Sequence, residues 1–213
     1  MNEFLSKITN EVFSRLHPRF QILDNIPLRM ARKREKCYSR WTVDVGFYKA
    51  IFLARLRLPL TELHRQLADH LGVSVSQIYH NAWRIFLRAE VLWGQISWGC
   101  CRLTLDKLFF CYRAQQLVAS KGFYNFIVRK PSLKQLTNVP DSNHNWKSRY
   151  FFVQCSNWVC RPSKWDSIGK EYDNTWGILD EFSESSVIAR SICTHFFILT
   201  HCVLFFNPSA LDD

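Results

Sequence analysis

The sequence lacks the motifs that carry most enzyme chemistry. It has no GxxxxGKS, GxxxxGKT or GxGxxG loop for phosphates, no HExxH helix for zinc and no GxSxG turn for a serine nucleophile. Its central and distal aspartates stand singly in unrelated contexts, so no carboxylate cluster for two metal ions is indicated. They are Asp106, Asp141, Asp166 and Asp173. We therefore predict that the chain is not an enzyme and uses no cofactor.

The common zinc arrangements and a secretory signal are also missing. Cys155 and Cys160 are separated by four residues, but the next histidine, His195, is far beyond the ~12–15 residues that a zinc finger requires. Residues 1–13 include Glu3 and Glu11 and have no continuous apolar run. We expect an intracellular protein, in the nucleus or the cytoplasm, whose cysteines are reduced, mostly buried thiols and not metal ligands.

What the chain does contain is apolar mass and positive charge. Hydrophobic residues make up 47% and aromatic residues 15% of its 213 residues, which is enough for a folded core. Lysine and arginine outnumber aspartate and glutamate by 28 to 18. Residues 121–170 hold nine basic and two acidic residues, whereas residues 171–213 hold one basic and seven acidic. A basic middle fits a nucleic-acid partner, DNA or RNA, and it fits an ordinary solvated face equally well.

Apolar periodicity predicts helices first and strands later. Helical spacing covers residues 1–20, 45–57, 61–71, 76–95 and 104–117. Pro18 is expected to end the first helix, Gly72 to end the third, and Ser76 to be the N-cap of the fourth. Short β-prone runs follow at residues 123–128, 133–139 and 148–154. The predicted fold class is α+β, with an N-terminal helical subdomain of about four helices followed by a small antiparallel β region.

We divide the chain into three parts. Residues 1–44 form an N-terminal segment with a basic loop, residues 45–165 form the main domain, and residues 166–213 form a divergent tail that is partly disordered or apolar. The apolar run at residues 187–206 barely reaches spanning length and includes Arg190, His195 and His201. Because such groups are costly inside a bilayer, we expect no membrane span.

Residues 64–83 have the pattern of a helix-turn-helix. Its small and apolar positions are filled by Ala68, Leu71, Gly72, Val73 and Ile78. A second helix beginning near Ser76 would present polar side chains to a DNA groove. These side chains are Gln77, His80, Asn81 and Arg84. The motif requires an apolar contact where Asn81 stands, so two core helices joined by a glycine turn are the alternative.

Basic and aromatic residues alternate in the run from Trp146 to Phe152. On a strand, Lys147, Arg149 and Phe151 would share one face, opposite Trp146, Tyr150 and Phe152. One face would contact phosphates while a ring stacks on a base, or the strand is simply half buried. The predicted contact residues are Lys130, Lys134, Trp146, Lys147 and Arg149.

Taken together, segments over about two thirds of the chain resemble the plant gypsy-type transposon domain family. They are IPLRMA (26–31), VGFYKAIFLARLRLPL (45–60), LGVSVSQIYHNAWRIFLRAEVLW (71–93), LDKLFFCYR (105–113), GFYNF (122–126) and SNHNWKSRYFFV (142–153). Members tend to have a proline near position 80, which this chain lacks. The resemblance implies a retrotransposon-derived, gag-like protein without catalysis, which associates with nucleic acid or with itself and binds no small-molecule substrate. The alternative function is a sequence-specific DNA-binding factor of the helix-turn-helix type.

Overall fold

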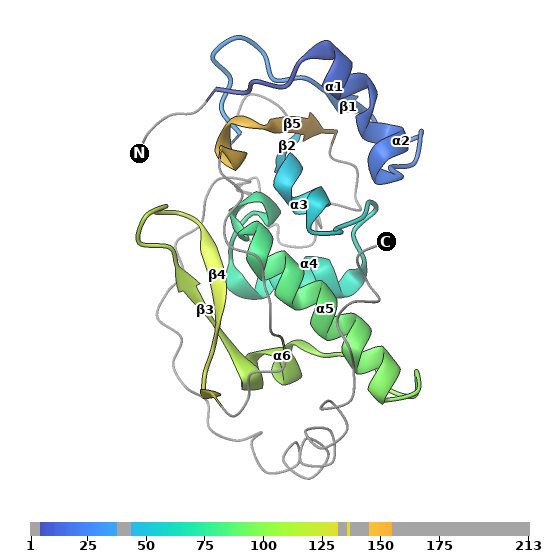
Figure 1. Cartoon of the computed structure of the whole chain (residues 1–213), viewed down its shortest axis with the longest axis vertical. Helices are drawn as coiled ribbons and strands as arrows, with labels where there is room; N and C mark the ends of the chain where they lie inside the picture. The colour runs from blue at the N-terminus through green and yellow to red at the C-terminus, as the bar shows by residue number, and fades with distance from the viewer. Residues whose placement is uncertain (1–4, 38–43, 132–135, 137–144, 155–213) are drawn as a thin grey trace, which may run out of the picture.

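The computed structural model describes residues 5–37, 44–131, 136 and 145–154 (Figure 1). It confirms an α+β fold, with helices concentrated early and small antiparallel sheets. The helices are α1 (Asn10–Ser14), α2 (Leu16–Phe20), α3 (Lys49–Leu53), α4 (Glu62–Leu71), α5 (His80–Ile96) and α6 (Leu105–Cys111), with short 3-10 turns η1 (Val75–Gln77) and η3 (Trp146–Ser148). The strands are β1 (Leu28–Arg29), β2 (Val45–Tyr48), β3 (Tyr112–Gln116), β4 (Tyr124–Val128) and β5 (Tyr150–Val153).

Strand β5 is the centre of a three-stranded antiparallel sheet in the order β1-β5-β2. Tyr48 pairs with Tyr150 at one end, and Leu28 and Val45 both pair with Val153 at the other. All four residues of β5 are buried, as expected for a central strand covered on both faces. The sheet thus joins the N-terminal segment to residues about 100 positions later in the chain.

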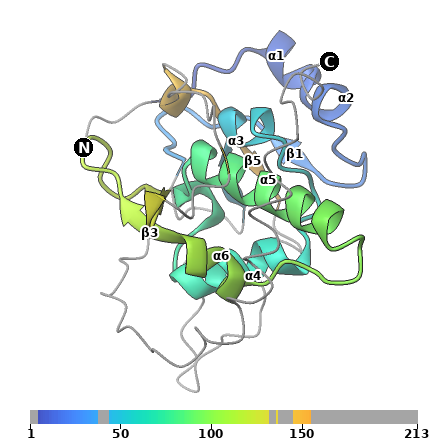
Figure 2. The same ribbon diagram turned by 60° about the horizontal axis from the view of Figure 1, so that its bottom comes forward.

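Strands β3 and β4 form a separate antiparallel hairpin. Helix α5 packs against β4, and a parallel bridge joins Ile78 to Tyr124. In both Figure 1 and Figure 2, α5 lies between α3 and α6, so it is the central helix of the molecule.

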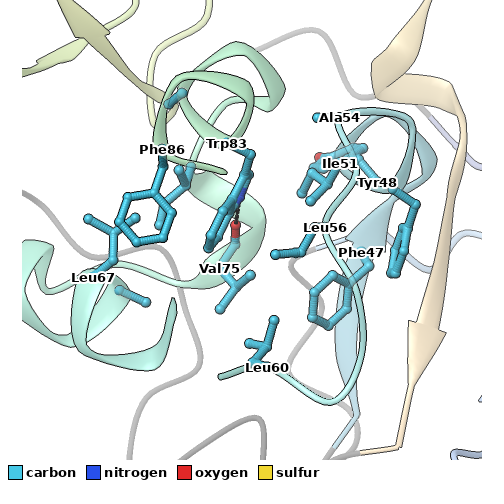
Figure 3. Close-up of a cluster of buried hydrophobic side chains, with 14 of the residues drawn as sticks. Phe47, Tyr48, Ile51, Ala54, Leu56, Leu60, Leu67, Val75, Trp83 and Phe86 are labelled. Atoms are coloured by element: carbon cyan, nitrogen blue, oxygen red, sulfur yellow. Dashed lines mark hydrogen bonds between the residues drawn. The ribbon is translucent and has the colours of Figure 1, made fainter. Parts of the chain in front are cut away.

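The buried core fills the space between α5 and the three-stranded sheet. Trp83 and Phe86 of α5 are fully buried, as is Phe47 of β2. Figure 3 shows the Trp83 ring between side chains of α3 and α4, with its indole N–H donating to the carbonyl oxygen of Val75 (3.4 Å). The indole therefore combines apolar burial with a satisfied donor.

Helix α4 begins and ends as predicted. Thr61 caps it, because its hydroxyl accepts the N–H of His64 (3.3 Å) and its own N–H donates to the His64 ring (3.4 Å). Gly72 ends it in a left-handed conformation at φ 63°.

The predicted helix at residues 45–57 is wrong in its first turn, and it also ends earlier than predicted, at Leu53. Residues 45–48 form β2, and helix α3 begins only at Lys49. The backbone of Gly46 lies so close to Cys37 that a Cβ atom would be 2.1 Å from the Cys37 carbonyl oxygen. This close approach and the pairing with β5 override the helical spacing.

Three other predicted boundaries differ. The single helix at residues 1–20 is divided into α1 and α2, and Pro18 lies inside α2, within the first turn where the missing N–H is unpaired anyway. Ser76 is not an N-cap, because η1 and an extended Ile78 and Tyr79 precede α5. The helix predicted to reach residue 117 ends at Cys111, where β3 begins.

Candidate nucleic-acid interface

Positive charge dominates the described part of the chain. These residues include 22 lysines and arginines against eight aspartates and glutamates. Two of the eight carboxylates, Glu35 and Asp44, bind the same partly buried guanidinium, that of Arg29. Within the described residues, cations therefore outnumber carboxylates by 14, which gives this part of the chain a positive potential.

The three-stranded sheet brings two of these cations together. The N–H of Lys49 donates to the carbonyl oxygen of Arg149 (2.8 Å) and extends the pairing of Tyr48 with Tyr150 by one residue. Arg149 is exposed and Lys49 is half buried. Neighbouring side chains at this edge therefore carry the same charge.

A third cation comes from α2. The ring of Phe20 lies 5.4 Å from that of Phe52, which holds the end of α2 against α3, one turn after Lys49. This packing brings Arg19 near Lys49. Burial first, and then the charges of Arg19 and Arg149, lower the pKa of Lys49 below its usual value.

The extended N-terminal segment adds Lys7. Its N–H donates to the carbonyl oxygen of Ser148 (2.7 Å), and the Ser6 hydroxyl donates to that of Tyr150 (2.6 Å). We call Lys7, Arg19, Lys49 and Arg149 the basic cluster. Within the residues that the structure describes, none of the four forms an ion pair with a carboxylate.

Trp146 and Lys147 lie beside the basic cluster, but not on a strand. They belong to η3, and all of residues 150–153 are buried, so the predicted alternation of a basic and an aromatic face is wrong. The ring of Trp146 is half buried. It is packed edge-on against four rings: Tyr48 and Phe123 at 4.8 Å, Tyr79 at 5.4 Å and His80 at 5.5 Å. Only part of the indole is left to stack on a base.

The Lys147 ammonium lies over two of these rings. It is 5.6 Å from the centre of Phe123 and 5.7 Å from that of Trp146, and burial lowers the pKa of this lysine. This geometry is that of a cation–π contact.

Lys130 is separated from these residues. Lys130 follows β4 at one end of the hairpin, where the N–H of Arg129 donates to the carbonyl oxygen of Cys111 (2.8 Å). Phe123, which contacts Trp146, lies at the other end of the hairpin. A strand rises about 3.3 Å per residue, which puts roughly 20 Å between the two ends. Lys134 lies outside the described residues.

The structure places three of the four residues predicted for a DNA-reading helix inside the protein, and the fourth, Arg84, is half buried. Gln77 is fully buried, and its side chain donates to the Gly122 carbonyl (3.1 Å) and accepts the N–H of Ser74 (3.0 Å). Its amide therefore ties η1 to the hairpin instead of facing solvent.

The next two predicted reading residues are buried as well. His80 is 1% exposed, and Asn81 accepts a hydrogen bond from the Arg84 guanidinium (2.7 Å) through its side-chain oxygen. Neither ring nitrogen of His80 has a hydrogen-bond partner among the residues that the structure describes. Burial, followed by the charge of Arg84, lowers the pKa of His80 to about 4, so this ring is neutral at physiological pH.

The thiols divide into two kinds. Cys37 and Cys111 are buried, and burial raises the pKa of Cys111 to about 11. Cys100 and Cys101 are exposed, so two of the four described thiols do not fit the expectation of mostly buried thiols. Cys155 and Cys160 lie outside the described residues.

The described residues offer neither a metal site nor a membrane span. They contain no group of three or more histidine, cysteine, aspartate or glutamate side chains placed to hold a metal ion. The helices among them are all too short or too polar to cross a membrane. The apolar run at residues 187–206 lies outside the described residues.

No family model matches the chain, and neither the curated proteins nor the solved structures searched give a match. The resemblance to the gypsy-type transposon family therefore stays a prediction.

The sequence predicted Lys147 and Arg149 as nucleic-acid contacts, and the structure places Lys147 over the Trp146 ring and leaves Arg149 exposed. It did not indicate Lys7, Arg19 or Lys49, because these residues reach Arg149 only through sheet pairing and ring packing over more than 100 positions. No local pattern marks them.

Proposed function

We propose that this chain is a retrotransposon-derived, gag-like, non-catalytic binding and assembly module that associates with nucleic acid. The observation that carries the binding part is the basic cluster, in which Arg19 and Arg149 lie near Lys49 and the backbone of Lys7 is bonded to Ser148. None of the four cations has a carboxylate partner among the described residues. The resemblance of the sequence to the gypsy-type family supports the same function.

The chemistry of the cluster suits phosphates. Guanidinium groups bind phosphate oxygens through two parallel hydrogen bonds, and an ammonium adds a mobile point charge. Like charges held together repel each other, so a polyanion between them relieves that repulsion. Arg149 is exposed and Lys49 is half buried, so their charges are available to a strand lying across this edge of the sheet.

The geometry favours contacts of the protein with the phosphates of the nucleic acid over contacts with its bases. The side chains predicted to read bases, Gln77, His80 and Asn81, are buried. Phosphate contacts fix a protein on nucleic acid without selecting a sequence. Binding is therefore expected to be insensitive to sequence and strongly dependent on salt.

The test is a fluorescence titration with mixed-sequence oligonucleotides at two salt concentrations. Arg149→Glu should weaken binding at least tenfold, and it should reduce the slope of log K against log salt by about 0.7 for a lost single-strand phosphate contact. The matched control is Arg102→Glu, which makes the same change of charge at an exposed site after α5 and should change affinity by less than about twofold.

Two outcomes would contradict the proposal. One is the absence of binding at low salt. The other is an equal loss for Arg149→Glu and Arg102→Glu, which would show that net charge alone determines binding.

A further inference from the structure

Two hydrogen bonds show which residues of the β3–β4 hairpin turn their backbone N–H and C=O groups toward the partner strand. The N–H of Leu117 donates to the carbonyl oxygen of Phe123 (2.8 Å), between the strands. The N–H of Tyr79 donates to the carbonyl oxygen of Tyr124 (2.8 Å), on the far side of β4. Because hydrogen-bonded and non-hydrogen-bonded pairs alternate in an antiparallel ladder, odd-numbered residues of β3 turn their backbone groups toward β4. Even-numbered residues turn theirs outward.

Ala114 and Gln116 therefore direct an N–H and a C=O each away from β4. Within the described part of the chain these groups have no hydrogen-bond partner. In Figure 1, β4 lies between β3 and the body of the molecule, so β3 is the outer strand.

This edge has few of the features that protect strand edges from pairing. Charged side chains, proline or a covering segment normally do so. Residues 114–120 contain no charge and no proline, and Val118 is 90% exposed. Arg113 is the only charged residue between positions 112 and 120.

We propose that β3 pairs antiparallel with β3 of a second copy of this chain, which joins two hairpins into one four-stranded sheet. The inference rests on the assembly part of the proposed function and not on its nucleic-acid part. A second copy of the chain is the partner, because the outward hydrogen-bonding groups of β3 match those of a second β3 in one register.

That register is centred on Gln115. In this register, Ala114 of each copy pairs with Gln116 of the other copy. The outward N–H and C=O groups of both residues are therefore hydrogen-bonded in both copies. The register also places Arg113 opposite Leu117, which avoids two like charges facing each other. Registers centred on Ala114 or Gln116 leave part of this set unpaired.

The first test measures dimerisation by sedimentation velocity over a concentration series, in enough salt to screen the positive charge of each copy. Gln116→Pro removes the outward N–H without touching the bonds to β4. It should raise the dimer dissociation constant at least tenfold, because each dimer loses two hydrogen bonds. Gln116→Ala keeps the N–H and should stay within about twofold of the unchanged chain.

The second test reads the register directly. At the centre of the pairing, the two Gln115 residues form a non-hydrogen-bonded pair, whose Cα atoms lie about 4.5 Å apart, within disulfide range. Gln115→Cys, oxidised with glutathione disulfide, should form a disulfide between the two copies of the chain. Mass spectrometry should identify it as a link between two peptides that each contain position 115. The matched control, Arg113→Cys, faces Leu117 of the other copy and should not link to itself.

Three results would overturn the inference. The chain is a monomer at every concentration and position 115 does not link. The chain dimerises, but Gln116→Pro has no effect and position 115 does not link. The chain is a monomer whose Ala114 and Gln116 amides are protected from hydrogen exchange, which would show that another segment of the same chain covers β3. If Gln116→Pro fails to fold, the cysteine pair decides, and nucleic-acid affinity is measured separately with the Arg149→Glu variant.

Discussion

The backbone N–H of Lys49 donates to the carbonyl oxygen of Arg149, so the first residue of α3 and the residue before β5 lie side by side. This bond continues a sheet whose central strand is buried along its whole length. The pairing that stabilises the fold is therefore also the pairing that assembles the basic cluster. Changes that loosen β5 should affect both.

Trp146 should matter mainly for stability. Trp146→Ala removes a ring packed against Tyr48, Tyr79, His80 and Phe123, and it should lower the free energy of unfolding by about 3 kcal/mol, the low end for tryptophan because the ring is half buried. Denaturant unfolding measures this.

The chain offers a control for this substitution. Trp98→Ala removes a ring that is 91% exposed and should change the free energy of unfolding by less than about 0.5 kcal/mol. Equal losses in the two variants would contradict the packing described for Trp146.

Gln77→Ala should separate structure from recognition. It breaks the bonds to Ser74 and Gly122 and should lower the free energy of unfolding by about 2 kcal/mol. Nucleic-acid affinity of the folded variant should stay within about twofold. A sequence-selective footprint that disappears in Gln77→Ala, with stability unchanged, would instead restore the DNA-reading helix.

His80 should make stability depend on pH. Its folded pKa of about 4 is below the usual value of 6.5, so the unfolded chain binds more protons between these limits. The stabilisation is complete above pH 6.5 and is lost as pH falls toward 4, by about 2 kcal/mol at pH 5. His80→Phe should remove this pH-dependent loss of stability without a loss at pH 7, because neither ring nitrogen has a partner in the described part of the chain. An unchanged difference between pH 7 and pH 5 in the variant would contradict this assignment.

Glu35 should stabilise the fold at neutral pH. Burial alone would raise its pKa, but hydrogen bonds from Arg29 and from the N–H of Arg32 lower it below its usual value. The contribution is therefore present above the unfolded pKa of 4.5 and is lost as pH falls through the lower folded value. Glu35→Ala should cost about 3 kcal/mol at pH 7, because Arg29 loses a partner within a largely buried pair. Thermal unfolding of this variant at pH 7 checks it, and a loss below 1 kcal/mol would count against it.

The parts of the fold with strong local signals were predictable. Thr61 and Gly72 mark the ends of α4 in the sequence because capping and the left-handed turn are local events. The α+β class followed from the change in pattern along the chain. The start of α3 was not predictable, because the apolar spacing at residues 45–48 fits a helix until Val153 and Phe152 are available to pair with it.

The residues of the candidate site also divide into those with a local sequence signal and those brought together only by the fold. Lys147 and Arg149 stand beside Trp146 in the sequence, and this local chemistry is the basis on which they are predicted as contacts. Lys49 and Arg19 reach the site only after the sheet and the Phe20–Phe52 contact have formed, and no motif encodes that proximity. The buried Gln77 has the polarity of a reading residue but the environment of a core residue, which sequence alone does not reveal.

Lysine footprinting in the presence of an oligonucleotide tests the central claim most directly. Acetylation of Lys7 and Lys49 should fall at least twofold when a mixed-sequence single strand is bound. Lys107, whose ammonium lies 4.3 Å from the Trp93 ring near α6, should react at an unchanged rate. Protection of Lys107 with none at Lys7 and Lys49 would contradict the account and place the nucleic acid on another face.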